Sequence, residues 1–308
     1  METISDLEEL SCPEGSYVTV GKFDGLHLGH RELIGGVLKA RDKGHKAVVI
    51  RLKIEKQQGE SLLTEKETGD ILEALGVDIL AEIPLTEAFR DMPAETFIKD
   101  ILAEKLQMKA FFCGEDFFFG KDRRGNIRLL EDLSAVYGFT LHVLPKKNGG
   151  AEAVSSSRIR TLLSDGAMHA VNALLGYRYF LEGEVVHGRH LATYLGFPTA
   201  NVVPPAEKLL PPFGVYAVLA ETGGKVYEGM ANLGVKPTVT DEKAVLLEVS
   251  LSGFSGNLYG KTLRTEFLEY IRPEKRFDSV DDLKHQLNLD FDGIRDFFHE
   301  KRGKETEC

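Results

Sequence analysis

The sequence contains few cysteines and no long run of apolar residues. Its three cysteines, Cys12, Cys113 and Cys308, are too few and too scattered to form a disulfide framework or a zinc site. No apolar run approaches the roughly 18 residues that a membrane-spanning helix needs. The acidic start METISDLEELSCPEG has neither the basic segment nor the apolar stretch of a signal peptide. These absences favour a reducing compartment, and we expect a cytoplasmic protein.

An excess of positive charge is also lacking. Lysine and arginine number 38 against 48 aspartates and glutamates, so the formal net charge is −10 at pH 7. This balance argues against a nucleic-acid or anionic-membrane partner, and we expect neither, although a local basic pocket for phosphates stays compatible with it. A length of 308 residues with 43% hydrophobic side chains is enough for two globular domains. We expect a monomer or a weak homo-oligomer.

The first half of the chain alternates short apolar runs with helical patterns. Four runs are typical of buried strands: residues 17–20, 47–50, 110–113 and 139–144. Between the second and the third, Thr64 and Glu67 have the spacing of a capping box at a helix start. Repeated β-α-β units predict a parallel, Rossmann-like sheet whose ligands bind at the carboxyl ends of the strands. We place this domain at residues 1–176.

From about residue 177 the pattern changes to closely spaced β-like runs separated by turn signals. In the run TLRTEFLEY, the alternation predicts that Leu263, Thr265 and Phe267 face inward. Closely spaced strands with few helices predict a small closed β-barrel. A helical segment beginning at Ser279 ends the chain. The predicted fold class is therefore α/β followed by β, with the barrel and its C-terminal helix at residues 177–308.

The decamer GKFDGLHLGH, residues 21–30, follows the first of the four strand-like runs and opens a helix. Backbone amides and the helix dipole at such a position favour a phosphate. Its glycines allow a tight turn and a close approach of the backbone to a ligand. The imidazoles of His27 and His30 can donate hydrogen bonds to phosphate oxygens or stabilise a leaving pyrophosphate. The alternative is a tight structural turn with two ordinary surface histidines.

Two further segments accompany this decamer. VSSSRIR, residues 154–160, offers hydroxyls at a helix start and two arginines that can reach a triphosphate. GEDFFFGKDRRGN, residues 114–126, begins with a run rich in aromatic side chains. Together the three blocks resemble the signatures of the nucleotidyltransferase superfamily in the version found in bacterial FAD synthetases, with Ser157 where that family has threonine. The resemblance implies catalytic roles for His27 and His30. It assigns ATP binding to Gly21, Phe23, Asp24, Gly29, Ser156, Ser157, Arg158 and Arg160, and the flavin and adenine pocket to Asp116 and Phe117.

One stretch departs from that family. After the second of these strand-like runs, related enzymes carry a T-F-D-P-H-P-like sequence near the flavin, whereas this chain has VIRLKIEKQQG at residues 49–59. Two interpretations stay open. The first is a harmless change in a loop, and the second is a weakened or altered adenylylation of FMN.

The second half carries its own motif, LGFPTANV at residues 195–202. The hydroxyl of Thr199 and the side-chain amide of Asn201 are hard oxygen ligands that suit Mg²⁺ carried mainly by nucleotide phosphates. The motif is followed by LPPFGVYAV, NLGVKPTV, LLEVSL and LYGKTLRTEFLEYIRPEKRF, in the order that riboflavin kinases show, so this half resembles that family. The resemblance implies that Glu248 is the base for the ribityl 5′-hydroxyl and that Arg272 acts where flavin and nucleotide meet. It assigns Gly188, Pro198 and Phe277 to the nucleotide and flavin sites.

These resemblances cover nearly the whole chain and imply an enzyme with two ATP sites. The barrel is expected to phosphorylate riboflavin to FMN, and the Rossmann-like half to adenylylate FMN to FAD with release of pyrophosphate. Each step uses ATP as co-substrate and a divalent cation, Mg²⁺. Two alternatives are a riboflavin kinase whose first half is degenerate or altered, and a non-catalytic flavin- or nucleotide-binding regulator. A base such as Glu248 argues against the regulator, because a pure binding protein needs no base.

Related kinases have Gly-Arg where this chain has Ala192 and Thr193. Losing an arginine near the phosphates is expected to weaken nucleotide binding by about 1–3 kcal/mol. The double variant Ala192→Gly/Thr193→Arg should therefore lower the KM for ATP in riboflavin phosphorylation, measured from initial rates. An unchanged KM would count against this expectation and would fit compensation by Arg189 or His190 in the same segment.

Overall fold

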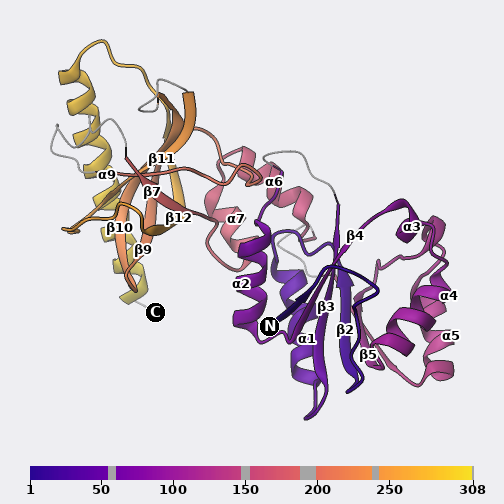
Figure 1. Ribbon diagram of the computed structural model, residues 1–308. Helices are drawn as coiled ribbons and strands as arrows, with labels where there is room; N and C mark the ends of the chain where they lie inside the picture. Colours follow the sequence, from indigo (N-terminus) through magenta and orange to yellow (C-terminus); the bar gives the residue numbers. More distant parts are fainter. Residues whose placement is uncertain (55–59, 147–152, 188–198, 238–242, 307–308) are drawn as a thin grey trace. The chain divides into compact units, whose positions relative to one another are not determined.

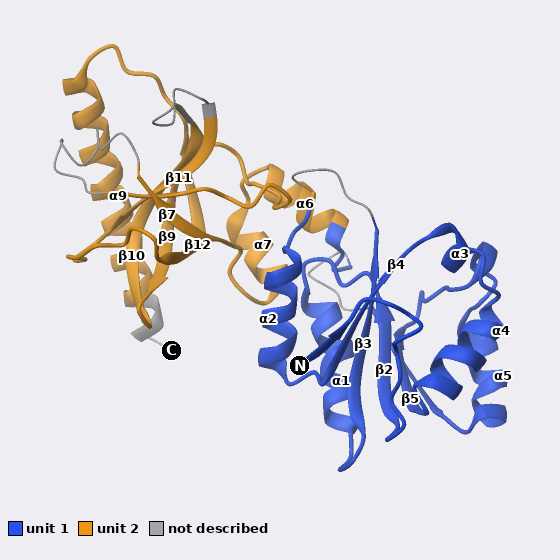
Figure 2. Ribbon diagram, viewed as in Figure 1, with its two compact units in different colours: residues 1–57, 61–156 blue, residues 58–60, 157–308 orange. Residues whose placement is uncertain are grey.

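A computed structural model describes residues 1–54, 60–146, 153–187, 199–237 and 243–306 (Figure 1). Contacts divide the chain into two compact units, residues 1–57 with 61–156 and residues 58–60 with 157–308 (Figure 2). This division reflects contacts between residues and does not test the functional boundary expected after residue 176, which stays a prediction. Among the described residues, no helix combines the length and the apolar character needed to cross a membrane.

The first unit is built on a six-stranded parallel sheet in the order β1-β4-β3-β2-β5-β6. The strands are β1 (Glu2–Ile4), β2 (Ser16–Gly21), β3 (Lys46–Lys53), β4 (Ile79–Pro84), β5 (Met108–Gly114) and β6 (Thr140–Leu144). The chain runs from β2 through β3 and β4 on one side, and then returns to β5 on the other side of β2. Open parallel sheets bind ligands at such a reversal, beyond the carboxyl ends of the two strands.

Helical segments cover both faces of this sheet (Figure 1). They are α1 (Leu28–Ala40), α2 (Glu65–Leu75), α3 (Glu87–Arg90), α4 (Ala94–Thr96), the π-helical η1 (Phe97–Lys105), the 3-10 turn η2 (Lys121–Arg123) and α5 (Ile127–Tyr137). On one face, Val37 of α1 packs with Ala110 and Phe112 of β5. On the other face, Ile98 of η1 and Leu130 of α5 join the larger core. The central strands are therefore apolar on both faces, as buried parallel strands are.

The predicted α/β organisation is confirmed, and two strands were missed. All four predicted strands are present, and Thr64 forms the predicted capping box with Glu67 at the start of α2. The strands β1 and β4 were not predicted. β4 contains the charged Glu82, which interrupts its apolar pattern, and this buried carboxylate accepts a hydrogen bond from Arg51 at 2.6 Å.

The second unit contains a closed barrel of antiparallel strands in the order β10-β11-β8-β7-β12-β9. The strands are β7 (Phe180–Val186), β8 (Ala200–Val202), β9 (Gly214–Thr222), β10 (Lys225–Pro237), β11 (Lys243–Leu251) and β12 (Thr262–Pro273). Leu263, Thr265 and Phe267 are fully buried, as their alternation predicts. The predicted closed barrel is therefore confirmed.

Three helices accompany the barrel in the sequence: α6 (Ser156–Ser164), α7 (Met168–Leu175) and α9 (Val280–Thr306). Ile294 and Phe298 of α9 pack against Val215 of β9. The side chain of Asn172 joins α7 to two points of the barrel. Its amide nitrogen donates to the carbonyl of Phe267 at 2.8 Å, and its oxygen accepts from the backbone N–H of Tyr179 at 2.7 Å.

Removing this amide is expected to destabilise the second unit. In Asn172→Ala, two backbone groups beside the fully buried Tyr179 and Phe267 lose their partner. We expect a loss of about 2–4 kcal/mol in the free energy of unfolding, measured by denaturant titration. Asn288→Ala is the matched control, because the exposed Asn288 amide bonds within its own helix α9, to the Lys284 carbonyl. Equal stability of the two variants would contradict this expectation.

Candidate active sites

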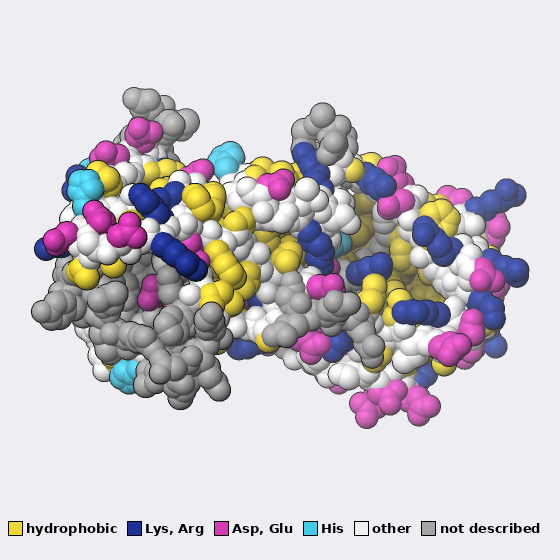
Figure 3. Space-filling model, turned by 90° about the horizontal axis from the view of Figure 1, so that it is seen from above, with side chains coloured by type: hydrophobic (Ala, Val, Ile, Leu, Met, Phe, Trp, Pro, Cys, Tyr) yellow, Lys and Arg dark blue, Asp and Glu magenta, His cyan; other side chains and the backbone are white. Residues whose placement is uncertain are grey.

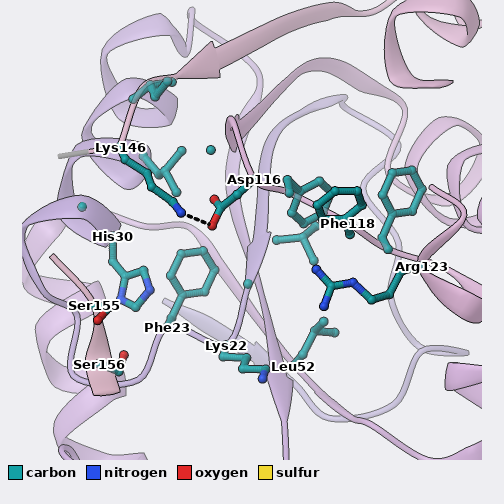
Figure 4. Close-up of a pocket in the computed structure, with 18 of the residues that line it drawn as sticks. Lys22, Phe23, His30, Leu52, Asp116, Phe118, Arg123, Lys146, Ser155 and Ser156 are labelled. Carbon is teal, nitrogen blue, oxygen red and sulfur yellow. Dashed lines mark ion pairs between the residues drawn. The ribbon is translucent and has the colours of Figure 1, made fainter. Parts of the chain in front are cut away.

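The carboxyl ends of the parallel strands surround a cavity of about 840 Å³ in the first unit (Figure 4). Its walls include Gly21 at the end of β2, Lys22 directly after it, Asp116 after β5 and Lys146 after β6. Figure 3 shows a hollow in this unit, with apolar side chains inside it and lysines and arginines around it. The cavity lies at the edge where a parallel sheet of this strand order is expected to bind its ligand.

The turn between β2 and α1 has an unusual backbone. Phe23 and Leu26 have positive φ angles of 48° and 40°, and Gly25 between them has a φ of 78°. A left-handed conformation costs a non-glycine residue about 1–2 kcal/mol, and the burial of both Phe23 and Leu26 holds the turn in this form. Within the turn, the carbonyl of Asp24 accepts a hydrogen bond from Ser156 Oγ at 2.8 Å. The fold therefore joins two of the segments predicted to bind ATP.

The two histidines of this turn are stacked on each other. His27 is the N-cap of α1, and its Nδ1 accepts from the backbone N–H of His30 at 3.4 Å. The ring centroids lie 3.6 Å apart with an interplanar angle of 18°. Burial lowers the pKa of His27 to about 4, and burial together with the neighbouring His27 lowers the pKa of His30 well below its usual value. Both imidazoles are therefore neutral at pH 7, and a bound triphosphate would raise both pKa values by favouring the charged form.

His30 also has an unused polar atom. Its Nδ1 is buried and has no hydrogen-bond partner in the part of the chain that the structure describes. His30 and Gly29 line the cavity, so a ligand oxygen could satisfy this nitrogen (Figure 4). Ser157, Arg158 and Arg160 lie on α6 in the second compact unit, and their contact with ATP stays a prediction.

Asp116 and Phe117, expected in the flavin and adenine pocket, line the same cavity. Asp116 makes an ion pair with Lys146 at 2.9 Å, and this carboxylate raises the pKa of Lys146 (Figure 4). Phe117 stacks on Phe119 with centroids 5.3 Å apart, which gives the cavity an aromatic side. Sequence reasoning missed Lys146, which follows a different strand and belongs to no motif.

The stretch that departs from related enzymes is partly described. β3 extends through Lys53, which pairs with Glu65 at the start of α2. Arg51 pairs with Glu82 of the neighbouring β4 at 2.6 Å. Leu52 lines the cavity, and the end of the stretch lies outside the described residues. Ion pairs of Arg51 and Lys53 therefore stabilise the end of β3, while Leu52 between them lines the cavity.

In the barrel, Glu248 of β11 is the direct neighbour of Asn201 of β8 in the antiparallel register. Residues paired in this way project from the same face, with Cβ atoms about 4.5–5.5 Å apart. Asn201 is only 3% exposed, and Glu248 is half-buried. Thr199, the residue before β8, lines a cavity of about 260 Å³ with Val249 and Tyr259. The predicted base and the predicted amide ligand thus lie together on the barrel wall.

Arg272 and Phe277 lie elsewhere in the second unit. Arg272 makes a bidentate ion pair with Asp290 of α9 at 2.9 and 2.6 Å, and Gln286 donates to the same carboxylate at 2.9 Å. Phe277 is half-buried, with the ammonium of Lys275 5.7 Å from its ring. Neither Arg272 nor Phe277 is among the described residues that line the smaller cavity. Their roles stay predictions.

The described residues contain no group of three or more His, Cys, Asp and Glu placed to hold a metal ion. The oxygen donors of Thr199 and Asn201 fit Mg²⁺, which combines few protein ligands with phosphate oxygens. Gly188 and Pro198 lie outside the described residues, so the structure does not test their predicted roles.

The neutral state of His27 predicts a dependence of stability on pH. Its pKa is about 4 in the folded protein against an ordinary value of 6.5, so the unfolded chain binds more protons between these values. The free energy of unfolding therefore does not depend on His27 above about pH 6.5. As the pH falls from there toward about 4, protonation of His27 in the unfolded chain lowers the free energy of unfolding by up to about 3 kcal/mol. His27→Asn, which keeps a capping side chain, should reduce the fall in Tm between about pH 7.5 and about pH 5. His299→Asn, at an exposed position on α9, is the control. Equal falls in Tm for all three proteins would contradict the expectation.

Two family models match the chain. One, described as FAD synthetase, matches residues 9–158, and the other, described as riboflavin kinase, matches residues 175–298. The first match includes five of the six parallel strands, β2 to β6, and the residues that line the cavity, and the second includes all six strands of the barrel.

Known relatives match along almost the whole chain. The bifunctional riboflavin kinase/FMN adenylyltransferase of Escherichia coli K12 is 35% identical, covering 97% of this chain and 98% of the relative. The Bacillus subtilis protein of the same name is 33% identical, covering 89% of this chain and 90% of the relative. A crystal structure from Streptococcus pneumoniae, described as a macrolide-efflux protein, is 29% identical with a TM-score of 0.82, covering 95% of this chain and 98% of that one. The chain therefore belongs to the family of bifunctional riboflavin kinase/FMN adenylyltransferases.

Proposed function

We propose that this chain converts riboflavin to FAD in two steps and uses ATP in each. The barrel phosphorylates riboflavin to FMN, and the Rossmann-like unit adenylylates FMN to FAD with release of pyrophosphate. The observation that supports this proposal is that each unit brings together side chains suited to one of the two steps. Glu248 lies opposite Asn201 in the barrel, and two stacked histidines begin α1 at the cavity of the other unit. The functional domains are residues 1–176 and 177–308.

Phosphorylation joins the ribityl 5′-oxygen of riboflavin to the γ-phosphorus of ATP and breaks the bond between that phosphorus and ADP. Glu248 accepts the hydroxyl proton as the new bond forms. Its place on a barrel strand fixes the direction of the carboxylate. Thr199 and Asn201 would hold Mg²⁺, which would supply charge neutralisation for the triphosphate. The remaining residues of the flavin and nucleotide sites are Arg272, Phe277, Gly188 and Pro198.

Adenylylation joins a phosphate oxygen of FMN to the α-phosphorus of ATP and releases pyrophosphate. The attacking oxygen is already anionic, so the step needs positioning and charge stabilisation rather than a base. His27 and His30, with the backbone amides at the start of α1, bind the leaving pyrophosphate. The triphosphate is also bound by Ser156, Ser157, Arg158 and Arg160. Asp116 and Phe117 hold the flavin or adenine ring.

The proposed partners are the small molecules riboflavin, FMN and ATP. The net charge of −10 supports the further proposal that the chain binds neither nucleic acid nor membrane. We also propose a cytoplasmic location and a monomer or weak homo-oligomer.

Purified protein incubated with riboflavin, ATP and Mg²⁺, followed by chromatography of the flavins, tests this proposal. FMN followed by FAD supports it. FMN alone would favour a kinase with an altered first half, and the paired charges of Arg51 and Lys53 near the flavin side are the observation behind that second candidate. Tight flavin binding without turnover would indicate a regulator.

Single substitutions should separate the two activities. His30→Ala removes a ring from the pyrophosphate site, so FAD formation should fall by at least about 100-fold while FMN accumulates. Glu248→Gln removes the base, so FMN formation should stop while FAD still forms from added FMN. Each variant serves as the control for the other in the same chromatographic assay. Loss of both products in either variant would show that the sites are not separate.

A further inference from the structure

Four basic side chains line the cavity of the first unit: Lys22, Arg90, Arg123 and Lys146. Lys146 is engaged by Asp116 at 2.9 Å. Within the described part of the chain, the other three take part in no ion pair. The lining also includes the acidic Glu32, Asp116 and Asp122, so four basic side chains stand against three acidic ones. A protein with a net charge of −10 thus keeps a small excess of positive charge in this cavity, and such charge favours an anionic ligand.

A constrained loop presents Arg123. Phe119 and Gly125 close the loop by exchanging backbone hydrogen bonds of 3.1 and 2.9 Å. Between them, Asp122 and Arg123 have positive φ angles of 55° and 57°, a conformation that costs about 1–2 kcal/mol at each non-glycine residue. Strain of this kind persists where the surroundings hold the backbone firmly, and it is concentrated at ligand sites.

The guanidinium of Arg123 points into the cavity, between Phe118 and Leu52 in the view of Figure 4. Its Cζ lies 4.8 Å from the ring centroid of Phe118, which is itself 48% exposed. Stacking on an aromatic ring orients the planar guanidinium without consuming its N–H groups. Two of these N–H groups can donate in parallel to one phosphate.

The adenylylation step requires a second cationic site. The FMN dianion attacks the α-phosphorus of the ATP tetraanion, the bond to the pyrophosphate oxygen breaks, and the FAD dianion and the pyrophosphate tetraanion leave with the same total charge and no proton transfer. His30, which is proposed to bind pyrophosphate, lies on the side of the cavity away from Arg123 (Figure 4). The attacking phosphate needs a cation of its own, because like charges repel strongly at bonding distance.

We propose that Arg123, assisted by Lys22, binds the 5′-phosphate of FMN and makes the adenylyltransferase site select FMN over riboflavin. This proposal rests on the proposed adenylyltransferase function. The aromatic side at Phe117 and Phe119 takes the flavin ring, and the phosphate then reaches the strand ends beside Lys22. Riboflavin presents a neutral hydroxyl in place of the phosphate and leaves the guanidinium without a charged partner.

The test compares full-length wild type, Arg123→Gln and the control Arg124→Gln, since Arg124 is exposed and is not among the residues lining the cavity. FAD formation from FMN and ATP with Mg²⁺ gives the KM for each substrate. Lumiflavin, which has the ring but no phosphate, serves as an inhibitor competing with FMN. We expect Arg123→Gln to raise the KM for FMN by about 10- to 100-fold, with the KM for ATP and the Ki for lumiflavin unchanged. Arg123→Lys should recover part of the loss.

Three results would overturn the assignment of Arg123. A raised KM for ATP alone would place the residue at the triphosphate, a raised Ki for lumiflavin would place it at the ring, and an unchanged KM for FMN would leave it without a role. If the wild type forms no FAD, the proposed function itself fails. Calorimetric titration with FMN then decides the assignment, with the barrel expected to bind FMN as its product in every protein. Weakening of one of two binding events in Arg123→Gln but not in Arg124→Gln supports the assignment, and two events equal to those of wild type overturn it.

Discussion

The proposed nucleotide site depends on the burial of one turn, the turn between β2 and α1. Phe23 and Leu26 are enclosed by the core, and this burial stabilises a backbone that would otherwise be unfavourable. That backbone directs the carbonyl of Asp24 toward Ser156 and sets His27 at the N-cap of α1. The same burial keeps the imidazoles uncharged. Packing therefore determines both the geometry and the protonation state of the site.

The two units position phosphoryl groups by different means, and the ionisation of the attacking oxygen explains the difference. In the kinase step the nucleophile is a hydroxyl, which needs a base, and a rigid strand holds Glu248, the proposed base, beside Asn201. In the parallel-sheet unit the nucleophile is already an anion. That site needs cations around the attacking phosphate instead, and the side chains of Arg123 and Lys22 in its cavity meet this need.

The sequence predicts features that depend on local patterns. Helical and strand periods follow from backbone geometry, so the alternation of elements, the capping box and the inward side of β12 could be predicted. The place of Arg123, which lies in the block at residues 114–126, and of Lys146 at one cavity could not be predicted, because they follow different strands and are brought together only through the order of strands in the sheet. β4 was missed because the charge of Glu82 interrupts its apolar run, and pairing with Arg51 allows that charge to be buried. The three residues of β1 are too few to show a period.

β8 is only three residues long, and its pairing with β11 and β7 determines where Asn201 lies. Successive side chains of a strand project from opposite faces, so a slip of one residue would turn the amide of Asn201 to the face opposite Glu248. If Glu248 and Asn201 act together as proposed, FMN production is also a measure of strand register. A preparation with native secondary structure but no kinase activity is what a barrel closed in the wrong register would give.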